Sequence, residues 1–218
     1  MNFLNKYGWL LCTIAMIGDL VVSLILSFFY KGYSSTKMSI SALGNPSSPV
    51  RVPFNLWMIL EGLLFLAAIP AIYKGYNSVS GGLTKVLVVF IAAFAIGACI
   101  FTGFFSVNES KDVVTTASKI HGAGSAIGFM LFLFVSLLLA ILSFKSTESG
   151  VGIISIVCFV LSLVFFVLFV MSDKPEFKDT FIQNEGLWQR LNLIFMYLPL
   201  IIISIKNISK VLFAKRTF

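Results

Sequence analysis

Six long apolar stretches, separated by short polar segments, dominate the pattern of this chain. About 20 apolar residues are enough for a helix to cross the roughly 30 Å of hydrocarbon in a bilayer. The stretches lack the alternation expected of barrel strands, and a segment in lipid must satisfy its own backbone hydrogen bonds. The pattern therefore predicts an all-α polytopic membrane protein, a bundle of six transmembrane helices. The predicted spans are residues 8–30, 54–73, 83–105, 120–143, 150–171 and 188–205.

The connections between these stretches are of two kinds. Those after the second and fourth stretches are short and contain glycines, so we expect stretches two and three, and four and five, to be antiparallel neighbours. The segment 31–53 is longer, irregular and rich in proline, and we expect it to fold back onto the bundle. The first stretch is longer than the apolar part of a signal peptide and has Asp19 at its centre, which indicates a retained helix. We predict a single transmembrane domain over residues 1–218.

Composition agrees with a membrane protein and narrows its chemistry. Only 11% of residues are charged, whereas charged residues make up about a quarter of a soluble domain. The three cysteines lie in apolar stretches without paired spacing, so neither a disulfide framework nor a metal site is indicated, and no cofactor motif is present. The net charge of +7 is spread over the loops, which favours membrane lipid rather than nucleic acid as the partner.

The orientation depends on weak signals. Lysines and arginines divide evenly between the two faces of the predicted bundle, so the positive-inside rule alone is undecided. The densest basic run follows the last span, and the acidic loop residues lie on the opposite face. We therefore expect both termini in the cytoplasm and the protein in the plasma membrane. The basic run consists of Lys206, Lys210, Lys215 and Arg216.

A few polar side chains lie within these stretches or at their ends. A charge at bilayer depth costs about 2.5–3.5 kcal/mol on insertion scales, so each such group needs a partner, a cavity or a function. Helical periodicity places Glu185, Gln189 and Asn192 on one face of the sixth span, and His121 with Ser125 on one face of the fourth. The fourth span also carries Gly124 and Gly128, a small-residue face that allows another helix to approach closely. In the third span, Ala93 and Gly97 are the candidate partners.

Costly polar groups are less costly when they share one cavity. We therefore expect a pocket that opens on the face opposite the termini, with Asp19 standing apart near the membrane centre as an intramembrane acid. Simpler roles remain open for each group. His121 could only bond a loop carbonyl or a lipid headgroup. Glu61 could form a structural ion pair with Arg190 or be protonated, and Asp19 could be a hydrogen-bonding group or a polar plug between helices. The predicted pocket residues are Ser41, Glu61, His121, Ser125, Glu185, Gln189, Arg190 and Asn192.

Several short motifs lie near the ends of the predicted spans. They are Ser39-x-Ser41-x-Leu43-Gly44, Phe54-Asn55, Gly103-Phe104-Phe105, His121-Gly122-x-Gly124 and Glu185-Gly186-Leu187-Trp188-Gln189-Arg190-Leu191. The order of these motifs resembles a bacterial six-span membrane family known as a domain of unknown function (DUF 998). After the third span, Ser106-Val107-Asn108-Glu109 departs from the proline and aspartate typical of that family. The resemblance implies the six-span architecture and a pocket, but no reaction.

The first functional hypothesis is that the pocket binds a lipid or another amphiphile, with Arg190 and His121 meeting an anionic headgroup. A second is a hydrolase or transferase for lipid-linked substrates, in which His121 is the acid or base and Glu185 or Glu109 orients it. A transporter that uses Asp19 and Glu61 is a third, although no inverted repeat is evident. A non-catalytic role, with a helix-mediated oligomer or a membrane-protein partner, is the fourth.

Overall fold

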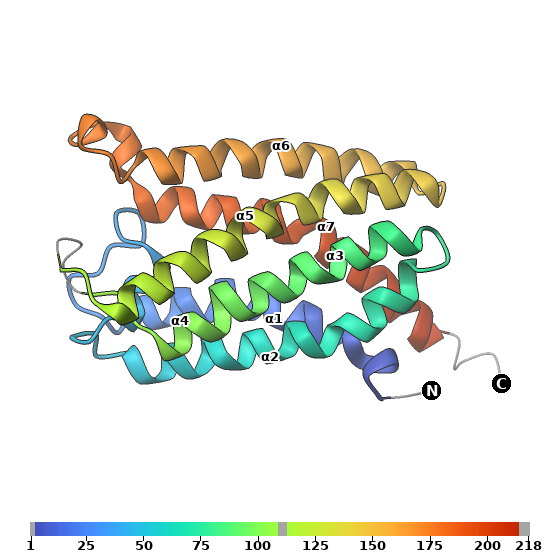
Figure 1. The fold of residues 1–218 in the computed structure, drawn as a ribbon, viewed down its shortest axis with the longest axis horizontal. Coiled ribbons are helices and arrows are strands. Elements are labelled where there is room, and N and C mark those ends of the chain that lie inside the picture. The colour runs from blue at the N-terminus through green and yellow to red at the C-terminus, as the bar shows by residue number, and fades with distance from the viewer. Residues whose placement is uncertain (1–2, 109–112, 214–218) are drawn as a thin grey trace.

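The computed structural model of the protein describes residues 3–108 and 113–213, and this part of the chain is helical without strands (Figure 1). The third span is formed by three consecutive helical segments, because a π-helix (η2) joins α3 to α4. The helices are α1 (Phe3–Ser27), α2 (Arg51–Tyr76), α3 (Gly81–Phe94), η2 (Ala95–Ile100), α4 (Phe101–Phe104), α5 (Thr116–Lys145), α6 (Ser149–Met171) and α7 (Glu185–Phe213), with short 3₁₀ turns η1 (Ile40–Gly44), η3 (Pro175–Phe177) and η4 (Phe181–Gln183).

Six helices in the described residues are long and apolar enough to cross a membrane, which confirms the predicted architecture. The protein is therefore a multi-pass membrane protein. The ends of the predicted spans differ from the helices by a few residues. The first helix ends at Ser27 rather than at residue 30, because residues 28–30 form turns. The last helix begins at Glu185, where a carboxylate suits the positive end of a helix dipole, and it continues past residue 205.

The helices pack as the lengths of their connections predict. Neighbouring spans α2 and α3 are in contact, and so are α5 and α6. Helix α1 packs mainly against α2 and also against α7, whereas α6 lies at the edge of the bundle on α5 and α7 (Figure 1). Only 17% of the most apolar stretch of α6 is buried inside the bundle, so most of this helix is left to face lipid.

The π-helix η2 is held between two glycine-bearing helices. A Cβ on Gly97 would lie 2.4 Å from the carbonyl oxygen of Gly124 in α5, and a Cβ on Gly62 of α2 would lie 2.6 Å from the carbonyl oxygen of Ala95. A Cβ on Gly128 would come within 3.0 Å of Ala98. The predicted approach of Gly97 to the small-residue face of the fourth span is confirmed.

Four aromatic side chains fill the centre of the bundle, each from a different helix. Phe65 of α2, Phe94 of α3, Phe132 of α5 and Tyr197 of α7 are at most 2% exposed. The Phe94 and Phe132 rings are 4.5 Å apart between centroids, and the Tyr197 ring lies 5.7 Å from that of Phe132. Such aromatic pairs add about 0.5–1.5 kcal/mol beyond their buried area. This packing fixes the ring of Tyr197 and therefore the position of its hydroxyl group.

The two ends of the bundle differ in how closely α5 and α6 approach each other (Figure 1). We call the end with the turns 77–80 and 146–148, where α1 begins and α7 ends, the closed end. There a Cβ on Gly8 would lie 2.6 Å from that of Ala71, and a Cβ on Gly152 would lie 2.7 Å from the Phe144 ring. We call the opposite end, with the segments 28–50, 105–108, 113–115 and 172–184, the open end.

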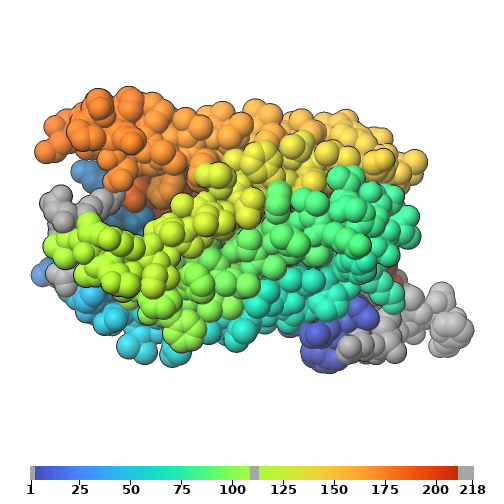
Figure 2. Space-filling view, viewed as in Figure 1, coloured from blue at the N-terminus to red at the C-terminus, as the bar shows by residue number. Residues whose placement is uncertain are grey.

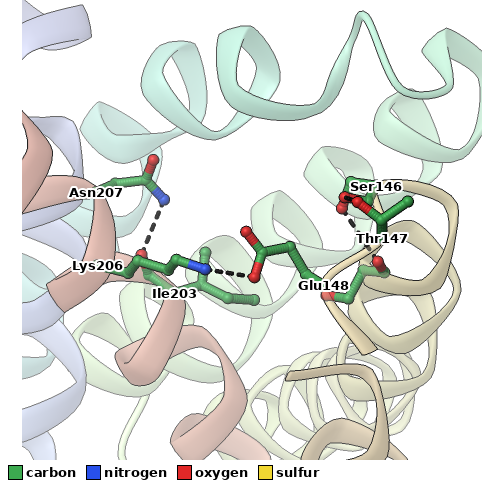
Figure 3. A network of polar contacts seen from close by, with 7 residues as sticks. Ser146, Thr147, Glu148, Ile203, Lys206 and Asn207 are labelled. Carbon is green, nitrogen blue, oxygen red and sulfur yellow. Dashed lines mark hydrogen bonds and ion pairs between the residues drawn. The ribbon is translucent and has the colours of Figure 1, made fainter. Parts of the chain in front are cut away.

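A surface ion pair joins the turn between α5 and α6 to α7 at the closed end (Figure 3). The Lys206 ammonium donates to the Glu148 carboxylate, and both side chains are more than 40% exposed. This hydrogen bond and the lysine charge lower the pKa of Glu148 below its usual value. Glu148 also precedes the first residue of α6, where a negative charge favours the helix terminus.

Candidate functional site

A cavity of about 820 Å³ lies at the open end of the bundle. Helices α5 and α6 lie close together near their short turn and move apart toward the open end (Figure 1). Figure 2 shows the surface hollowed between the orange end of α6 and the yellow-green start of α5. The first turns of α5, the last turns of α6, the start of α7 and η1 all contribute to the lining.

The lining changes from charged to apolar between the rim and the interior. Lys37, Lys119 and Lys174 line the cavity and are exposed. Farther inside, aromatic and aliphatic side chains make up most of the wall: Phe54, Met58, Phe94, Phe129, Phe166 and Phe169. Five predicted site residues also belong to this lining, together with the predicted outlier Asp19: Ser41, His121, Ser125, Glu185 and Gln189.

His121 is oriented by the backbone at the end of α4. The His121 Nδ1 atom lies 2.9 Å from the carbonyl oxygen of Phe105, and a carbonyl can only accept, so Nδ1 carries the hydrogen. In the neutral ring, Nε2 is then the acceptor, and it has no hydrogen-bond partner among the described residues. The loop-carbonyl bond that the sequence allowed is therefore present, and it leaves the second ring nitrogen of a cavity residue able to accept a proton. One turn along α5, the Ser125 hydroxyl forms a hydrogen bond of 3.4 Å with the Thr102 hydroxyl of α4.

The segment 31–50 folds back onto the bundle, as predicted. Ile40 is 4% exposed and Leu43 is fully buried, because η1 turns both side chains inward. The side-chain Oε1 of Gln189 accepts a 2.6 Å hydrogen bond from the Ile40 amide. Ser41 faces the cavity and donates to the hydroxyl of Ser39. Gln189 therefore acts first as the connection between α7 and the loop that forms one cavity wall.

Arg190 holds the same loop but does not belong to the cavity lining. Its Nη1 donates to the carbonyl oxygens of Ser35 at 2.6 Å and of Gly186 at 3.0 Å, and its Nη2 donates to the Tyr33 hydroxyl at 2.8 Å. Tyr33 in turn donates to the Ser39 carbonyl oxygen, and burial raises the pKa of Tyr33. The ion pair between Arg190 and Glu61 that the sequence left open is not formed, because the guanidinium is bound by the loop and by Gly186.

Glu61 and Asp19 meet the same tyrosine in the membrane interior. The Tyr197 hydroxyl lies 2.8 Å from Asp19 Oδ2 and 3.5 Å from Glu61 Oε1. Asp19 is 4% exposed and lines the cavity, whereas Glu61 is fully buried and does not. The predicted division, with Glu61 in the pocket and Asp19 apart, is therefore wrong. Glu61 lies a few turns into α2 from the open end, but its side chain points to the bundle centre and not into the cavity.

Two further predicted residues have different outcomes. Asn192 is fully buried outside the cavity lining, and its side-chain amide has no hydrogen-bond partner among the described residues. Glu109, the alternative acid for His121, lies outside the described residues.

Sequence reasoning missed Tyr197 and Tyr33 as partners of the predicted ionisable groups. Tyr197 lies eight residues, or about two helical turns, after Gln189 on the same face of α7. Extending the predicted polar stripe beyond Asn192 would therefore have reached it. Tyr33 lies in an irregular loop where no periodicity applies, and only the structure reveals its contact with Arg190. The lysines of the rim were counted for orientation, not as site residues.

The family described as a protein of unknown function (DUF998) matches residues 13–206 of the chain. The chain belongs to the DUF998 family. The match extends from within α1 to within α7, so the DUF998 region contains all the cavity residues described above. Comparison with curated proteins found no match, and comparison with solved structures found none either. Because the DUF998 family has no assigned function, the function must be argued from the site.

Proposed function

We propose that this DUF998 protein binds a membrane amphiphile with an anionic headgroup in the cavity between α5 and α6, and that it does so in the plasma membrane. The observation that carries the proposal is the parting of α5 and α6 at the open end, which leaves the cavity hollowed toward the side of the bundle (Figure 2). An amphiphile can enter such a cavity from the bilayer without leaving its apolar surroundings.

The size and the polarity of the cavity support an amphiphile. About 820 Å³ lies within the range of roughly 300–1,000 Å³ that holds drug-sized ligands. This volume accommodates a headgroup together with part of an acyl chain. Apolar side chains such as Phe129 and Phe166 suit the chain, whereas Ser41, His121 and Gln189 offer polar atoms to a headgroup.

The charges around the cavity favour an anionic headgroup. Lys37, Lys119 and Lys174 stand at the rim against two carboxylates, Asp173 and Glu185. Lysine is a compact positive charge that binds phosphate oxygens well. If the termini are cytoplasmic, as the basic run after the last span predicts, this rim lies at the outer headgroup layer. Arg190 acts indirectly in this proposal, because it positions the loop that carries Lys37.

A steric test compares two adjacent residues of α5. Ala126 lines the cavity, whereas Ile127 is 58% exposed and is not part of the lining. Each variant, Ala126→Phe and Ile127→Phe, is reconstituted in nanodiscs that contain phosphatidylglycerol and phosphatidylcholine, and retained lipid is measured by native mass spectrometry. We expect Ala126→Phe to lose the retained phosphatidylglycerol and Ile127→Phe to keep it. Equal retention by both variants would contradict binding in the cavity.

A charge test uses the rim lysines. The double variant Lys37→Ala and Lys119→Ala removes two of the three lysine charges from the lining. We expect the preference for phosphatidylglycerol over phosphatidylcholine to disappear, while total lipid retention persists through the apolar wall. An unchanged preference would rule out headgroup recognition by these lysines.

The geometry of His121 favours a second candidate, a hydrolase or transferase for lipid-linked substrates. The Phe105 carbonyl fixes the hydrogen on Nδ1, which leaves Nε2 as a general base in the cavity. His121→Asn keeps a donor for Phe105 but removes this base. If the protein is such an enzyme, the His121→Asn variant should lose turnover of a fluorescent phospholipid and still bind it. If wild type shows no turnover of ester-linked or phosphate-linked lipid probes, the catalytic candidate fails and the binding proposal is unaffected.

A further inference from the structure

Asp19, Tyr197 and Glu61 form a hydrogen-bonded row across three helices, α1, α7 and α2. The Tyr197 oxygen is the middle atom, 2.8 Å from Asp19 Oδ2 and 3.5 Å from Glu61 Oε1. Tyr197 and Glu61 are fully buried, and Asp19 is 4% exposed. The row crosses the apolar interior, where an ionised carboxylate needs a compensating partner.

If both carboxylates are ionised, the row has only one hydrogen for its two hydrogen bonds. A tyrosine hydroxyl has one hydrogen to donate, and the shorter contact assigns it to Asp19. The longer contact is then a hydrogen bond only if Glu61 supplies the hydrogen. Glu61 Oε2, also fully buried, has no hydrogen-bond partner among the described residues. An unpartnered buried oxygen costs much less on a neutral carboxyl group than on a carboxylate.

The other ionisable groups near the row do not neutralise two negative charges. Cys99 of η2 is next to Glu61 and is a fully buried thiol. Arg190 of α7 acts on Asp19 electrostatically, but its guanidinium donors are bound to the loop residues Tyr33 and Ser35. Two carboxylates this close cannot both ionise readily in such surroundings.

Among the described residues, the row meets the cavity at Asp19. Asp19 lines the cavity, whereas Tyr197 and Glu61 belong to no part of its lining and have no exposed surface. The hydrogen-bonded route from Glu61 to the cavity runs through Tyr197 and Asp19.

We propose that Glu61 and Asp19 share one exchangeable proton through Tyr197, and that this proton-binding site communicates with water through the cavity between α5 and α6. In the resting state the proton is on Glu61. When Glu61 gives its proton to the Tyr197 oxygen, the original Tyr197 proton passes to Asp19. Tyr197 stays neutral, Glu61 becomes a carboxylate, and Asp19 then releases the proton to water in the cavity. This inference goes beyond amphiphile binding and does not depend on it.

Infrared spectroscopy of the full chain in nanodiscs tests the site, because a protonated carboxyl group absorbs apart from a carboxylate. We expect wild type to show a protonated-carboxyl band at neutral pH that shifts slowly in heavy water. Glu61→Gln should lose this band, and Asp19→Asn should keep it. Glu176→Gln, which changes an exposed loop acid, is the matched control and should leave both the band and its exchange rate unchanged.

Tyr197→Phe tests the relay itself. This variant keeps the ring in the aromatic cluster and removes only the hydroxyl, so the fold is preserved even if Glu61→Gln fails to fold. The Glu61 band should persist, and its exchange with heavy water should be slower by about tenfold or more. Absence of the band in wild type, its loss in Asp19→Asn but not in Glu61→Gln, or equal exchange rates in wild type and Tyr197→Phe would each overturn the proposal.

Discussion

The two ends of the bundle contain similar kinds of residues but use them differently. At the closed end, Gly152 of α6 lies against Phe144 of α5, and the ionisable residues Glu148 and Lys206 meet each other on the surface. At the open end, α5 and α6 part, and His121, Glu185 and Lys119 line a cavity instead. Polarity alone therefore does not mark a site in a membrane helix. Polar residues become candidates for function where the helices around them separate.

The largest expected effect tests the close packing of the closed end. A Cβ on Gly8 would lie 2.6 Å from Ala71 Cβ and 3.3 Å from the Ala68 carbonyl oxygen, whereas a Cβ on Gly122 at the open end meets nothing within 4 Å. We expect Gly8→Leu to lower the free energy of unfolding by about 2–3 kcal/mol, because overpacking forces α1 and α2 apart. Gly122→Leu should unfold close to the wild-type temperature.

Thermal unfolding in detergent, followed by circular dichroism, measures this difference. Because Gly122 lines the cavity, Gly122→Leu should also reduce lipid retention while stability is kept. Equal destabilisation by the two substitutions would show that the contact of α1 with α2 at Gly8 is no tighter than the surroundings of Gly122 at the start of α5.

An intermediate effect is expected from the loop that closes one side of the open end. Arg190→Ala removes the donors for the carbonyl oxygens of Ser35 and Gly186 and for Tyr33. Charge-assisted hydrogen bonds contribute about 1.5–3 kcal/mol, and partial exposure of Arg190 places the expected loss near 1–2 kcal/mol. Faster trypsin cleavage after Lys37 would report the release of the loop.

Arg51→Ala is the matched control for that experiment, because Arg51 is an exposed arginine near the same end. It should change neither the unfolding temperature nor the cleavage rate. If Arg190→Ala behaves like Arg51→Ala, the loop is held by other contacts, such as the Gln189 bond to Ile40.

The smallest effect is expected from the ion pair of the closed end. Because the pKa of Glu148 is lowered in the folded state, the pair stabilises the fold at neutral pH. That contribution disappears as the pH falls through the lowered pKa. Glu148→Gln should therefore lower the unfolding temperature slightly at neutral pH and not at acid pH, and added salt should reduce the difference. A difference that persists in acid would mean that Glu148 acts through packing.

The sequence was sufficient to predict the spans, because an apolar run of this length has few alternatives to a membrane helix. It also predicted the contact between Gly97 and Gly124, since small residues at helical spacing allow close approach. The grouping of polar residues was predicted less well. Periodicity places a side chain on a face of its own helix, but it does not say which other helix that face meets.

Glu61 and Arg190 illustrate this limit. Both lie near the expected face along the chain, yet Glu61 turns to the bundle centre and Arg190 turns to a loop. The direction of Glu61 depends on how α2 is rotated against α7, and that of Arg190 depends on the fold of an irregular segment. Neither property is encoded in the sequence of a single helix. Asp19 was expected to stand apart from the pocket, yet it lines the cavity and contacts Tyr197.

The π-helix in the third span has a consequence for insertions and deletions. A π turn contains about one residue more than an α turn, so the residues after η2 are rotated by about 100° relative to those before it. Deleting one residue between Ala95 and Ile100 would therefore restore a regular α-helix and leave Thr102 facing Ser125, because the π turn takes up the extra residue. Inserting a further residue in the same segment would rotate Thr102 away from Ser125 unless the π turn widened again, so the polar wall of the cavity would tolerate a deletion here better than an insertion.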